Sequence, residues 1–573
     1  MFSPLDTARF RVESAFPVEM IAEEKTIKRD VSGTLRLGVL LDSVVVPAWV
    51  YSVLENLRNA DGISIALVVL NRPKAKERRT VRQRAYDAYC RLDRLVFAGK
   101  IRKDAFALTD ASDLLRGATS IDSSAIGVPR TEPGNGNDSD AVAVDLLLDF
   151  GLAESEAGHA FRSTYGVMHF HASDDDVYQG GPDSFWEMYE KNPVSGTTLR
   201  LTNETAPEGE LLFRAYSRTH PYSLLMNRNE VYWKAAAIFT AQVRILRDRP
   251  MGARTAVASE PTGEARIYTT PSLWQLSKFM VRALRQLLLR QFRSRLFHEC
   301  WVLAFADRVP GEDRLPGERE RFRTIKPPAG RFYADPWAVS YKGKEYIFFE
   351  DYEFDAFRGQ IGCLELNPTS GEVAAINTVI KEEFHMSYPC VFEADGNFFM
   401  IPETAEDKSI RLYRAEVFPW KWKLDSMLME NVSAVDSTLH WHDGRFWLFT
   451  NMSPPGSSSH DELHLFYADS LRGPWLPHRN NPIASDSRHA RGAGPLFKVG
   501  KILYRPSQNC SIAYGRSIVI NEIETLTVDE YREKVASEIN PEWIGDNSIR
   551  THTLSMSNRL TVTDGFRYVP RLG

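Results

Sequence analysis

Four carboxylate residues stand at matching places in short aromatic segments of the C-terminal half. Asp335 lies in RFYADPW, Glu350 in FFEDY, Glu403 in MIPET and Asp436 in VDST. Two carboxyl groups beside one bond, one protonated and one ionised, are the groups that cleave or transfer a glycosidic bond. A lone Asp at a turn or Glu at a strand end is more often structural. The recurrence of four such residues is what favours an acidic centre.

Basic, aromatic and amide side chains occupy corresponding places in the same segments. An arginine can hold a phosphate through two parallel hydrogen bonds, which the hydrolysis of a neutral glycan does not require. The arginines therefore indicate a phosphorylated donor such as a nucleotide sugar; the alternative is that they neutralise the nearby carboxylates. The expected substrate-binding residues are Trp337, His385, Tyr388, Arg491, Arg505 and Gln508.

These segments belong to a repeat of short strands. KGKEYIFFE, DGNFFMIPE, DGRFWLFTN and VGKILYRPS each place a turn before a strand, at intervals of about 50 residues, which are typical of propellers and arrays. A fifth unit is expected if the strand around Cys300–Phe305 pairs with strands near residues 550–570, because closure removes free sheet edges. Residues 298–573 are therefore predicted to form an all-β, five-bladed propeller.

The N-terminal half alternates apolar strands with helices. Residues 35–47, 48–60 and 63–71 read as strand, helix and strand, the pattern of a parallel sheet. No G-x-G-x-x-G follows the first strand, so nothing supports a dinucleotide site. A chain of 573 residues is longer than one hydrophobic core usually supports. We therefore expect a separate Rossmann-type α/β domain over residues 35–245, after an N-terminal extension of residues 1–34.

Residues 246–297 join the two domains. A polar, Pro- and Gly-rich linker precedes a helical pattern over residues 271–297 that contains six Lys or Arg and no acid. One interpretation is a helix on an anionic membrane surface, with Trp274 and Phe292 near the headgroups. The other is an interdomain helix whose basic face is solvated.

Composition narrows the partners and the compartment. The net charge of -5, from 75 acidic and 70 basic residues, argues against nucleic acid. Five scattered cysteines without a CxxC pair argue against zinc and disulfides. No cofactor and no metal site are recognisable, and a cation between paired carboxylates on the axis is left open. Without a signal-peptide pattern or an apolar run of about 18 residues, the expected location is the cytoplasm, with peripheral contact at the inner membrane surface left open.

Residues 166–212, which begin GVMHFHASDDD, resemble the central signature of the methionyl-tRNA formyltransferase family. The resemblance implies a site built from an Asn, a His and an Asp. His171 matches the His, whereas His169 stands for the Asn and Pro207 for the Asp. Glu208 is the adjacent carboxylate. We therefore expect a formyltransferase-like scaffold without formyl transfer, in which His169, His171 and Glu208 are the candidate residues.

RFYADPW and VDST resemble the Asp motifs of five-bladed glycoside hydrolases of the arabinanase, xylosidase and invertase type. The resemblance implies that Asp335 acts as nucleophile or base and that Asp436 orients the acid and tunes its pKa. The general acid of those enzymes falls at Ala493 here. Glu403 and Glu350 are the carboxylates that could replace it.

The order of the motifs RFYADPW, HMSYPCVFE, IPET, VDSTLHWHDGRFWLF and RPSQNCSIAYG resembles the propeller domain at the N-terminus of plant glucosamine inositolphosphorylceramide transferases. In that family a separate glycosyltransferase domain follows the propeller. The resemblance therefore implies carbohydrate chemistry but leaves open whether the propeller itself performs the transfer.

Three functions remain open at this point. We favour glycosyl transfer at the propeller axis in surface polysaccharide or glycolipid biosynthesis, because the hydrolase acid is lost and arginines are present. In that case Asp335 is base or nucleophile, Asp436 orients, Glu403 is the acid or binds the acceptor, and Arg505 contacts phosphate. The alternatives are a glycoside hydrolase with a relocated acid and a non-catalytic glycan-binding or scaffold protein. Acyl transfer at His171 is the least favoured.

Overall fold

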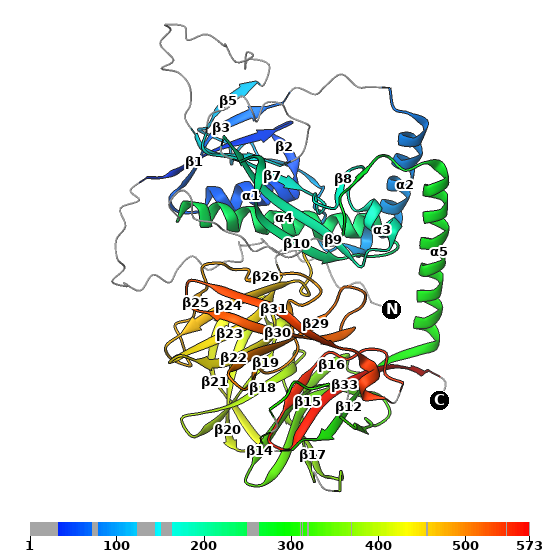
Figure 1. Ribbon diagram of the computed structural model, residues 1–573, viewed down its shortest axis with the longest axis vertical. Coiled ribbons are helices and arrows are strands. Elements are labelled where there is room, and N and C mark those ends of the chain that lie inside the picture. The colour runs from blue at the N-terminus through cyan, green and yellow to red at the C-terminus, as the bar shows by residue number, and fades with distance from the viewer. Residues whose placement is uncertain are drawn as a thin grey trace.

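The computed structural model describes residues 33–71, 78–122, 144–150, 163–204, 206–248 and 263–571, apart from residues 310, 312, 318–319, 368–369, 454–455 and 546. Two domains lie one above the other, and helix α5 (Leu273–Leu296) runs along one side of both (Figure 1). The expected N-terminal extension and most of the expected linker fall outside the described residues.

The N-terminal domain is built on a seven-stranded sheet in the order β10-β9-β7-β6-β1-β3-β5. Strands β1, β3, β5, β6 and β7 are parallel, whereas β9 and β10 run antiparallel at one edge. The expected α/β class is confirmed. The strands are β1 (Leu35–Leu41), β3 (Ile63–Leu70), β5 (Thr119–Asp122), β6 (Val144–Asp149), β7 (Ser163–His171), β9 (Val194–Asn203) and β10 (Ala206–Arg218).

Helices cover this sheet because their apolar residues recur at helical spacing. Helix α1 begins after Pro47 and buries five side chains, including Trp49 and Leu57. Helix α4 lies between the sheet and the propeller (Figure 1). The helices are α1 (Ala48–Arg58), α2 (Val81–Phe97), α3 (Phe185–Glu190) and α4 (Leu224–Arg247), and two ribbons pair β2 (Val45–Pro47) with β4 (Leu108–Asp110) and β8 (Tyr178–Gly180) with β11 (Arg266–Tyr268).

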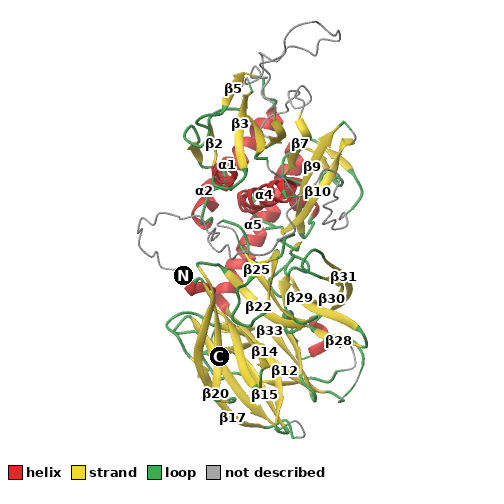
Figure 2. Ribbon diagram, turned by 90° about the vertical axis from the view of Figure 1, so that its left-hand side faces the viewer, coloured by secondary structure: helices red, strands yellow, loops and turns green. Residues whose placement is uncertain are grey.

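The C-terminal domain is a ring of five antiparallel sheets, which confirms the five-bladed propeller (Figure 2). Blades one to four follow one another along the chain. Their strands are β14 (Arg331–Tyr341), β15 (Lys344–Glu353), β16 (Arg358–Leu366) and β17 (Val373–Ile380); β18 (Ser387–Ala394), β19 (Asn397–Glu403), β20 (Ser409–Val417) and β21 (Lys421–Glu430); β22 (Ala434–His442), β23 (Arg445–Met452), β24 (Glu462–Ala468), β25 (Leu476–Pro477) and β26 (Ala484–Ser485); β27 (Arg491–Gly492), β28 (Phe497–Val499), β29 (Ile502–Asn509), β30 (Ser517–Leu526) and β31 (Tyr531–Ile539).

The fifth blade closes the ring with strands from both ends of the domain. Strand β12 (Phe297–Asp307) pairs antiparallel with β33 (Leu560–Pro570) along its whole length, as the sequence predicted. Strands β13 (Arg323–Ile325) and β32 (Leu554–Met556) complete this sheet. The turns at 342–343, 395–396 and 443–444 have positive φ at both residues, the geometry of tight type I′ hairpins. Closure leaves the inner strands around one axis.

A buried ion pair joins the two domains. Lys234 of α4 lies 2.5 Å from Asp461 of the propeller, and both side chains are almost fully buried. Nearby, the backbone N–H of Ser487 donates to the Tyr216 carbonyl at 2.9 Å. The ring of Tyr216 is also covered by the guanidinium of Arg488. Polar and charged contacts therefore fix the N-terminal domain on the propeller.

Candidate active site at the propeller axis

The inner strands of three blades share a backbone distortion that carries functional side chains. Asp335, Tyr388 and Asp436 each have a positive φ, at 52°, 44° and 51°. At each of them the register to the second strand shifts, as in a β-bulge. Such a conformation costs a non-glycine residue about 1–3 kcal/mol, and strain of this kind gathers at functional sites.

The residue just before each bulge pairs with a polar residue on the second strand. Ala334 pairs with Glu350, and Ser387 pairs with Glu403. In blades three and four the corresponding second-strand positions hold Asn451, paired with Val435, and Gln508, paired with Arg491. The blade repeat therefore delivers a ring of polar groups to one level of the axis.

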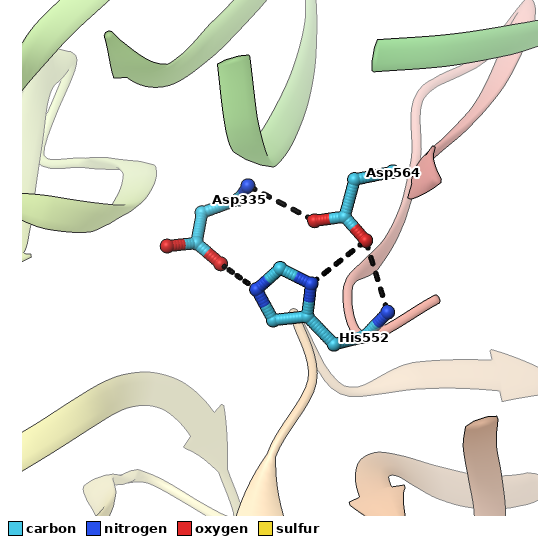
Figure 3. Close-up of side chains that lie close together, drawn as sticks. All are labelled: Asp335, His552 and Asp564. Carbon is cyan, nitrogen blue, oxygen red and sulfur yellow. Dashed lines mark hydrogen bonds and ion pairs between the residues drawn. The ribbon is translucent and has the colours of Figure 1, made fainter. Parts of the chain in front are cut away.

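Asp335 is held by a histidine that the sequence analysis missed. Nε2 of His552 lies 2.9 Å from Asp335, and Nδ1 lies 2.9 Å from Asp564 (Figure 3). Burial lowers the pKa of His552, but the charges of Asp564 and Asp335 outweigh it and raise that pKa to about 10. The three groups lie close enough to hold a cation. Protonation of both ring nitrogens makes His552 an ion-pair partner instead of a ligand.

The same contacts set the charge of Asp335. Burial alone would raise the pKa of this carboxyl, but His552 and the hydroxyl of Thr553, 3.0 Å away, lower it below its usual value. The backbone N–H of Tyr388 donates to the other carboxylate oxygen at 3.2 Å. Asp335 is therefore an ionised carboxylate fixed in one orientation, the state required of a base or nucleophile.

Glu350 and Glu403 have the opposite tendency. Burial raises the pKa of Glu350 well above its usual value, and the charges of Asp335 and Glu403 raise it further. Burial and Asp436 likewise raise the pKa of Glu403. A Cβ on Gly359 would lie 2.6 Å from a Glu350 carboxylate oxygen, so this close approach requires glycine. The raised pKa of both glutamates favours the protonated form, in which a carboxyl can donate a proton.

Asp436 is anchored from the fourth blade. Its carboxylate accepts from Nε of Arg491 at 2.6 Å and from Nε2 of Gln508 at 3.1 Å. Its backbone N–H donates to Glu403 at 3.3 Å. Arg491 also donates to Nδ1 of His460 at 2.9 Å. Asp436 therefore lies between the basic group of the site and one of its protonated acids.

His385 and Tyr388 also reach this cluster. Nδ1 of His385 accepts from the Gly359 backbone N–H at 2.9 Å, which leaves Nε2 to face Glu350 at 3.6 Å. The Tyr388 hydroxyl lies 2.8 Å from Thr438 and accepts from the Gly494 N–H at 2.6 Å. Tyr388 is fully buried, so it braces blades two, three and four instead of facing solvent.

Two expected substrate contacts lie elsewhere. Trp337 is 4% exposed, packs in the core between blades one and two, and donates its indole N–H to the Val391 carbonyl. Arg505 is 2% exposed and paired with Glu533 at 2.6 Å. Its guanidinium donates in addition to two backbone carbonyls. Neither side chain is placed to bind sugar or phosphate, so both expectations are corrected.

Several site residues were missed because the loops that carry them show no repeat. His460 and Tyr514 contact Arg491, with the guanidinium 4.8 Å from the Tyr514 ring. Tyr514 also lies against the His552 ring, with centroids 5.2 Å apart. The residues that sequence reasoning did not select are Asn451, His460, Tyr514, His552 and Asp564. For Asn451, its place at the end of DGRFWLFTN, where other repeats carry Glu350 and Glu403, was an available signal.

The candidate residues of the N-terminal domain lie at the carboxyl end of β7. Nδ1 of His169 is 3.1 Å from Asp149, and Nε2 of His171 is 3.6 Å from Asp175. Burial lowers the pKa of His171, so it is mainly neutral near pH 7. Glu208 belongs to β10, but its side chain is outside the described part of the structure. The expected scaffold without formyl transfer stays a prediction.

Comparison with known families shows that the propeller is similar in sequence to one described family. Residues 324–564 match the family described as "Glucosamine inositolphosphorylceramide transferase 1, N-terminal". The propeller is similar to this domain, as the order of its motifs predicted. Proteins named glucosamine inositolphosphorylceramide transferase 1 match from Oryza sativa subsp. japonica, 36% identical over 205 residues, and from Arabidopsis thaliana, 33% identical over 248 residues. These alignments cover 35% and 41% of this chain and only 27% and 32% of the relatives.

Solved structures of carbohydrate-active enzymes align with part of the chain. RS223 β-xylosidase aligns at 12% identity and a TM-score of 0.30, over 41% of this chain and 95% of that one. An endo-arabinanase from Bacillus licheniformis aligns at 16% identity and a TM-score of 0.28, over 40% of this chain and 91% of that one.

Proposed function

We propose that this chain catalyses glycosyl transfer at the propeller axis, in the biosynthesis of a surface polysaccharide or glycolipid. The feature that carries this proposal is one buried cluster of carboxyls: contact with His552 at 2.9 Å lowers the pKa of Asp335, whereas burial and neighbouring negative charge raise the pKa values of Glu350 and Glu403. Such divergence assigns a base and an acid. The match with proteins named as transferases supports transfer as the reaction.

In the proposed reaction the protonated glutamate and the ionised aspartate have complementary roles. Glu403 or Glu350 gives its proton to the oxygen that leaves the anomeric carbon. Asp335 accepts the proton of the attacking acceptor hydroxyl or itself attacks the anomeric carbon. Asp436 positions Glu403 through the hydrogen bond from its backbone N–H. Arg491, which is buried at the acidic centre beside Asp436, is the basic group that a donor phosphate would meet, whereas Arg505 is paired with Glu533 away from it.

The proposed donor is a nucleotide sugar, and the proposed acceptor is a sugar or glycolipid. The guanidinium of Arg491 at the acidic centre supports a phosphorylated donor. We place the activity in the cytoplasm, with residues 271–297 in contact with the inner membrane surface. No resident cofactor enters this scheme.

Glycoside hydrolysis is the second candidate, and a specific observation favours it. The position of the hydrolase acid holds Ala493, which is fully buried. The raised pKa values of Glu350 and Glu403 supply the missing protonated carboxyl. The same acid and base would serve hydrolysis if water replaced the acceptor hydroxyl.

The test is a ligand screen by thermal shift with wild type, Asp335→Asn and the control Asp355→Asn, which changes an exposed turn of the same blade. Nucleotide sugars, free oligosaccharides and folates are compared, and turnover is measured with each ligand that stabilises. We expect a nucleotide sugar to stabilise wild type and the control, with turnover lost in Asp335→Asn.

Other outcomes separate the alternatives. Stabilisation and cleavage of free glycans only would replace transfer by hydrolysis. Stabilisation by a glycan without turnover in wild type would indicate a binding module. A folate response that persists in Asp335→Asn would place the activity in the N-terminal domain. Equal turnover in wild type and in a folded Asp335→Asn variant would refute the axial site.

A further inference from the structure

Helix α5 has two apolar faces that point in different directions. Its inner face, Leu276, Phe279 and Ala283, is buried against aromatic side chains of the N-terminal domain. A capping box between Ser272 and Gln275 starts the helix. The other face, called here the outer stripe, is exposed on a helix that lies at the edge of the molecule (Figure 1). The outer stripe consists of Trp274, Val281, Leu284, Leu288 and Phe292, which are 57–76% exposed.

Packing accounts for the inner face but not for the outer stripe. The residues of the outer stripe recur at intervals of seven, three, four and four. They therefore form one line along a helix that is about 36 Å long. Large apolar side chains scattered singly on a surface are ordinary, whereas a continuous line of this length marks an interaction surface. Val281, Leu284, Leu288 and Phe292 lie beside Arg285 and Arg295 on the same exposed face of the helix.

The five arginines of α5 divide into two groups. Arg282 donates to two backbone carbonyls of α3, and Arg290 hydrogen-bonds the Tyr222 hydroxyl. Arg293 stacks over the ring of Tyr568 at 4.9 Å. These three side chains hold the helix on the protein. Arg285 and Arg295 are exposed and lie beside the outer stripe.

We propose that the outer stripe of α5 docks on an anionic phospholipid bilayer. A helix that lies in a membrane interface buries apolar side chains between the headgroups and presents arginine and lysine to the phosphates. Trp274 has the amphipathic ring that is enriched at this depth. No described helix is long and apolar enough to cross a membrane, so the contact is with the surface.

Charge decides between a bilayer and a second copy of the chain. Two α5 helices that packed through their outer stripes would bring the same cations together with no acidic side chain on either helix, and like charges in an interface are unfavourable. A phosphate surface supplies the missing negative charge. The cations of α5 are Lys278, Arg282, Arg285, Arg290, Arg293 and Arg295.

The C-terminal end of α5 leads towards the acidic centre. Directly after the helix, the ring of His298 stacks on Phe354 at 5.1 Å, and Phe354 contacts Tyr352. Tyr352 packs against His385, which faces Glu350. Docking of α5 would therefore hold blade one near the lipid surface, within reach of a lipid-linked acceptor. This last step alone rests on the proposed function.

The test is sedimentation of the full chain with vesicles of phosphatidylcholine alone or mixed with phosphatidylglycerol. We expect binding to the anionic vesicles only, weakened by salt. Leu288→Glu with Phe292→Glu should weaken binding at least tenfold. Arg285→Glu with Arg295→Glu should weaken it by at least about fivefold per residue, because each change removes a positive charge and adds a negative one. The control Leu95→Glu alters a leucine on α2 that is 83% exposed, more than Leu288 or Phe292, and should bind as wild type.

The result that overturns the proposal is equal sedimentation of wild type and the Leu288→Glu/Phe292→Glu variant, with circular dichroism showing both folded. Dimerisation of wild type without vesicle binding, lost in the same variant, would replace the bilayer by a second copy. Turnover on a water-soluble acceptor is measured in parallel. The Leu288→Glu/Phe292→Glu variant should lose vesicle binding and keep its turnover, whereas Asp335→Asn should lose turnover and keep vesicle binding. These two results distinguish a failure of this proposal from a failure of the proposed function.

Discussion

Replacement of His552 by glutamine tests the electrostatic basis of the axial site. His552 is 2% exposed and lies between Asp335 and Asp564. Glutamine keeps a polar side chain of similar length but removes the positive charge. The variant therefore leaves two buried carboxylates without their shared cation, a situation that is strongly destabilising in proteins.

The magnitude follows from the pKa of His552, which rises from 6.5 to about 10 on folding. A raised histidine pKa stabilises the folded state fully below the unfolded value, and the contribution is lost as the pH rises through the folded value. Each pKa unit corresponds to about 1.36 kcal/mol. The free energy of unfolding of wild type should therefore exceed that of His552→Gln by about 5 kcal/mol below pH 6, about 3 kcal/mol at pH 8 and less than about 1 kcal/mol at pH 10.

Urea unfolding between pH 6 and pH 10 measures this gap. Tryptophan fluorescence follows the transition, and Trp301, whose ring centroid lies 4.1 Å from that of His552, contributes to it. The control His442→Gln changes a histidine at a hairpin of blade three and should stay within about 0.5 kcal/mol of wild type. A gap that stays constant from pH 6 to pH 10, or that is below about 1 kcal/mol at pH 7, would refute a charged His552.

Two further predictions concern the acids and the domain interface. Glu403→Gln and Glu350→Gln replace protonated carboxyls by neutral amides, so the melting temperature of both variants should remain near that of wild type. The rate of transfer should fall by about a hundredfold or more in the variant that lacks the proton donor. A large loss of stability would show that the carboxyls are ionised. Lys234→Met should cost about 3–5 kcal/mol in chemical unfolding, because Asp461 is left buried and unpaired, and adding Asp461→Leu should restore most of it.

The blade repeat was visible in the sequence because successive blades place similar types of residue at equivalent positions. In blades one to three, a turn with positive φ at both residues comes before the second strand, and a polar residue towards the far end of that strand lies at the axis. Glu350 and Glu403 were therefore selected by position. Asp335 and Asp436 were selected by motif, and the structure places all four in one cluster.

The last blade escaped this pattern because it is made of two distant segments. His552 and Asp564 come within reach of Asp335 only when β33 pairs with β12 and closes the ring. Pairing of these strands was predicted from the need to remove free edges. The ion pairs were not, since no local pattern marks the loop that carries His552.

Side-chain direction explains the two misplaced substrate contacts. Arg505 stands three residues before Gln508 on β29, and residues an odd number apart on a regular strand point to opposite faces. Gln508 reaches the axis, so Arg505 points away to Glu533. For Trp337 the reason is the bulge between Ala334 and Trp337, which turns Asp335 to the axis and leaves the indole in the core. A register shift of this kind has no signal in the sequence.

The interface between the domains bears on the same cluster. Nδ1 of His460 accepts from Arg491, which in turn holds Asp436. The neighbouring residue, Asp461, is fixed by Lys234 of the N-terminal domain. One peptide unit therefore separates the interface ion pair from the contact that orients the arginine of the site. The α/β domain carries His169 and Pro207 at its own expected catalytic positions. It still has a role in this arrangement, because its helix α4 fixes the loop that positions Arg491.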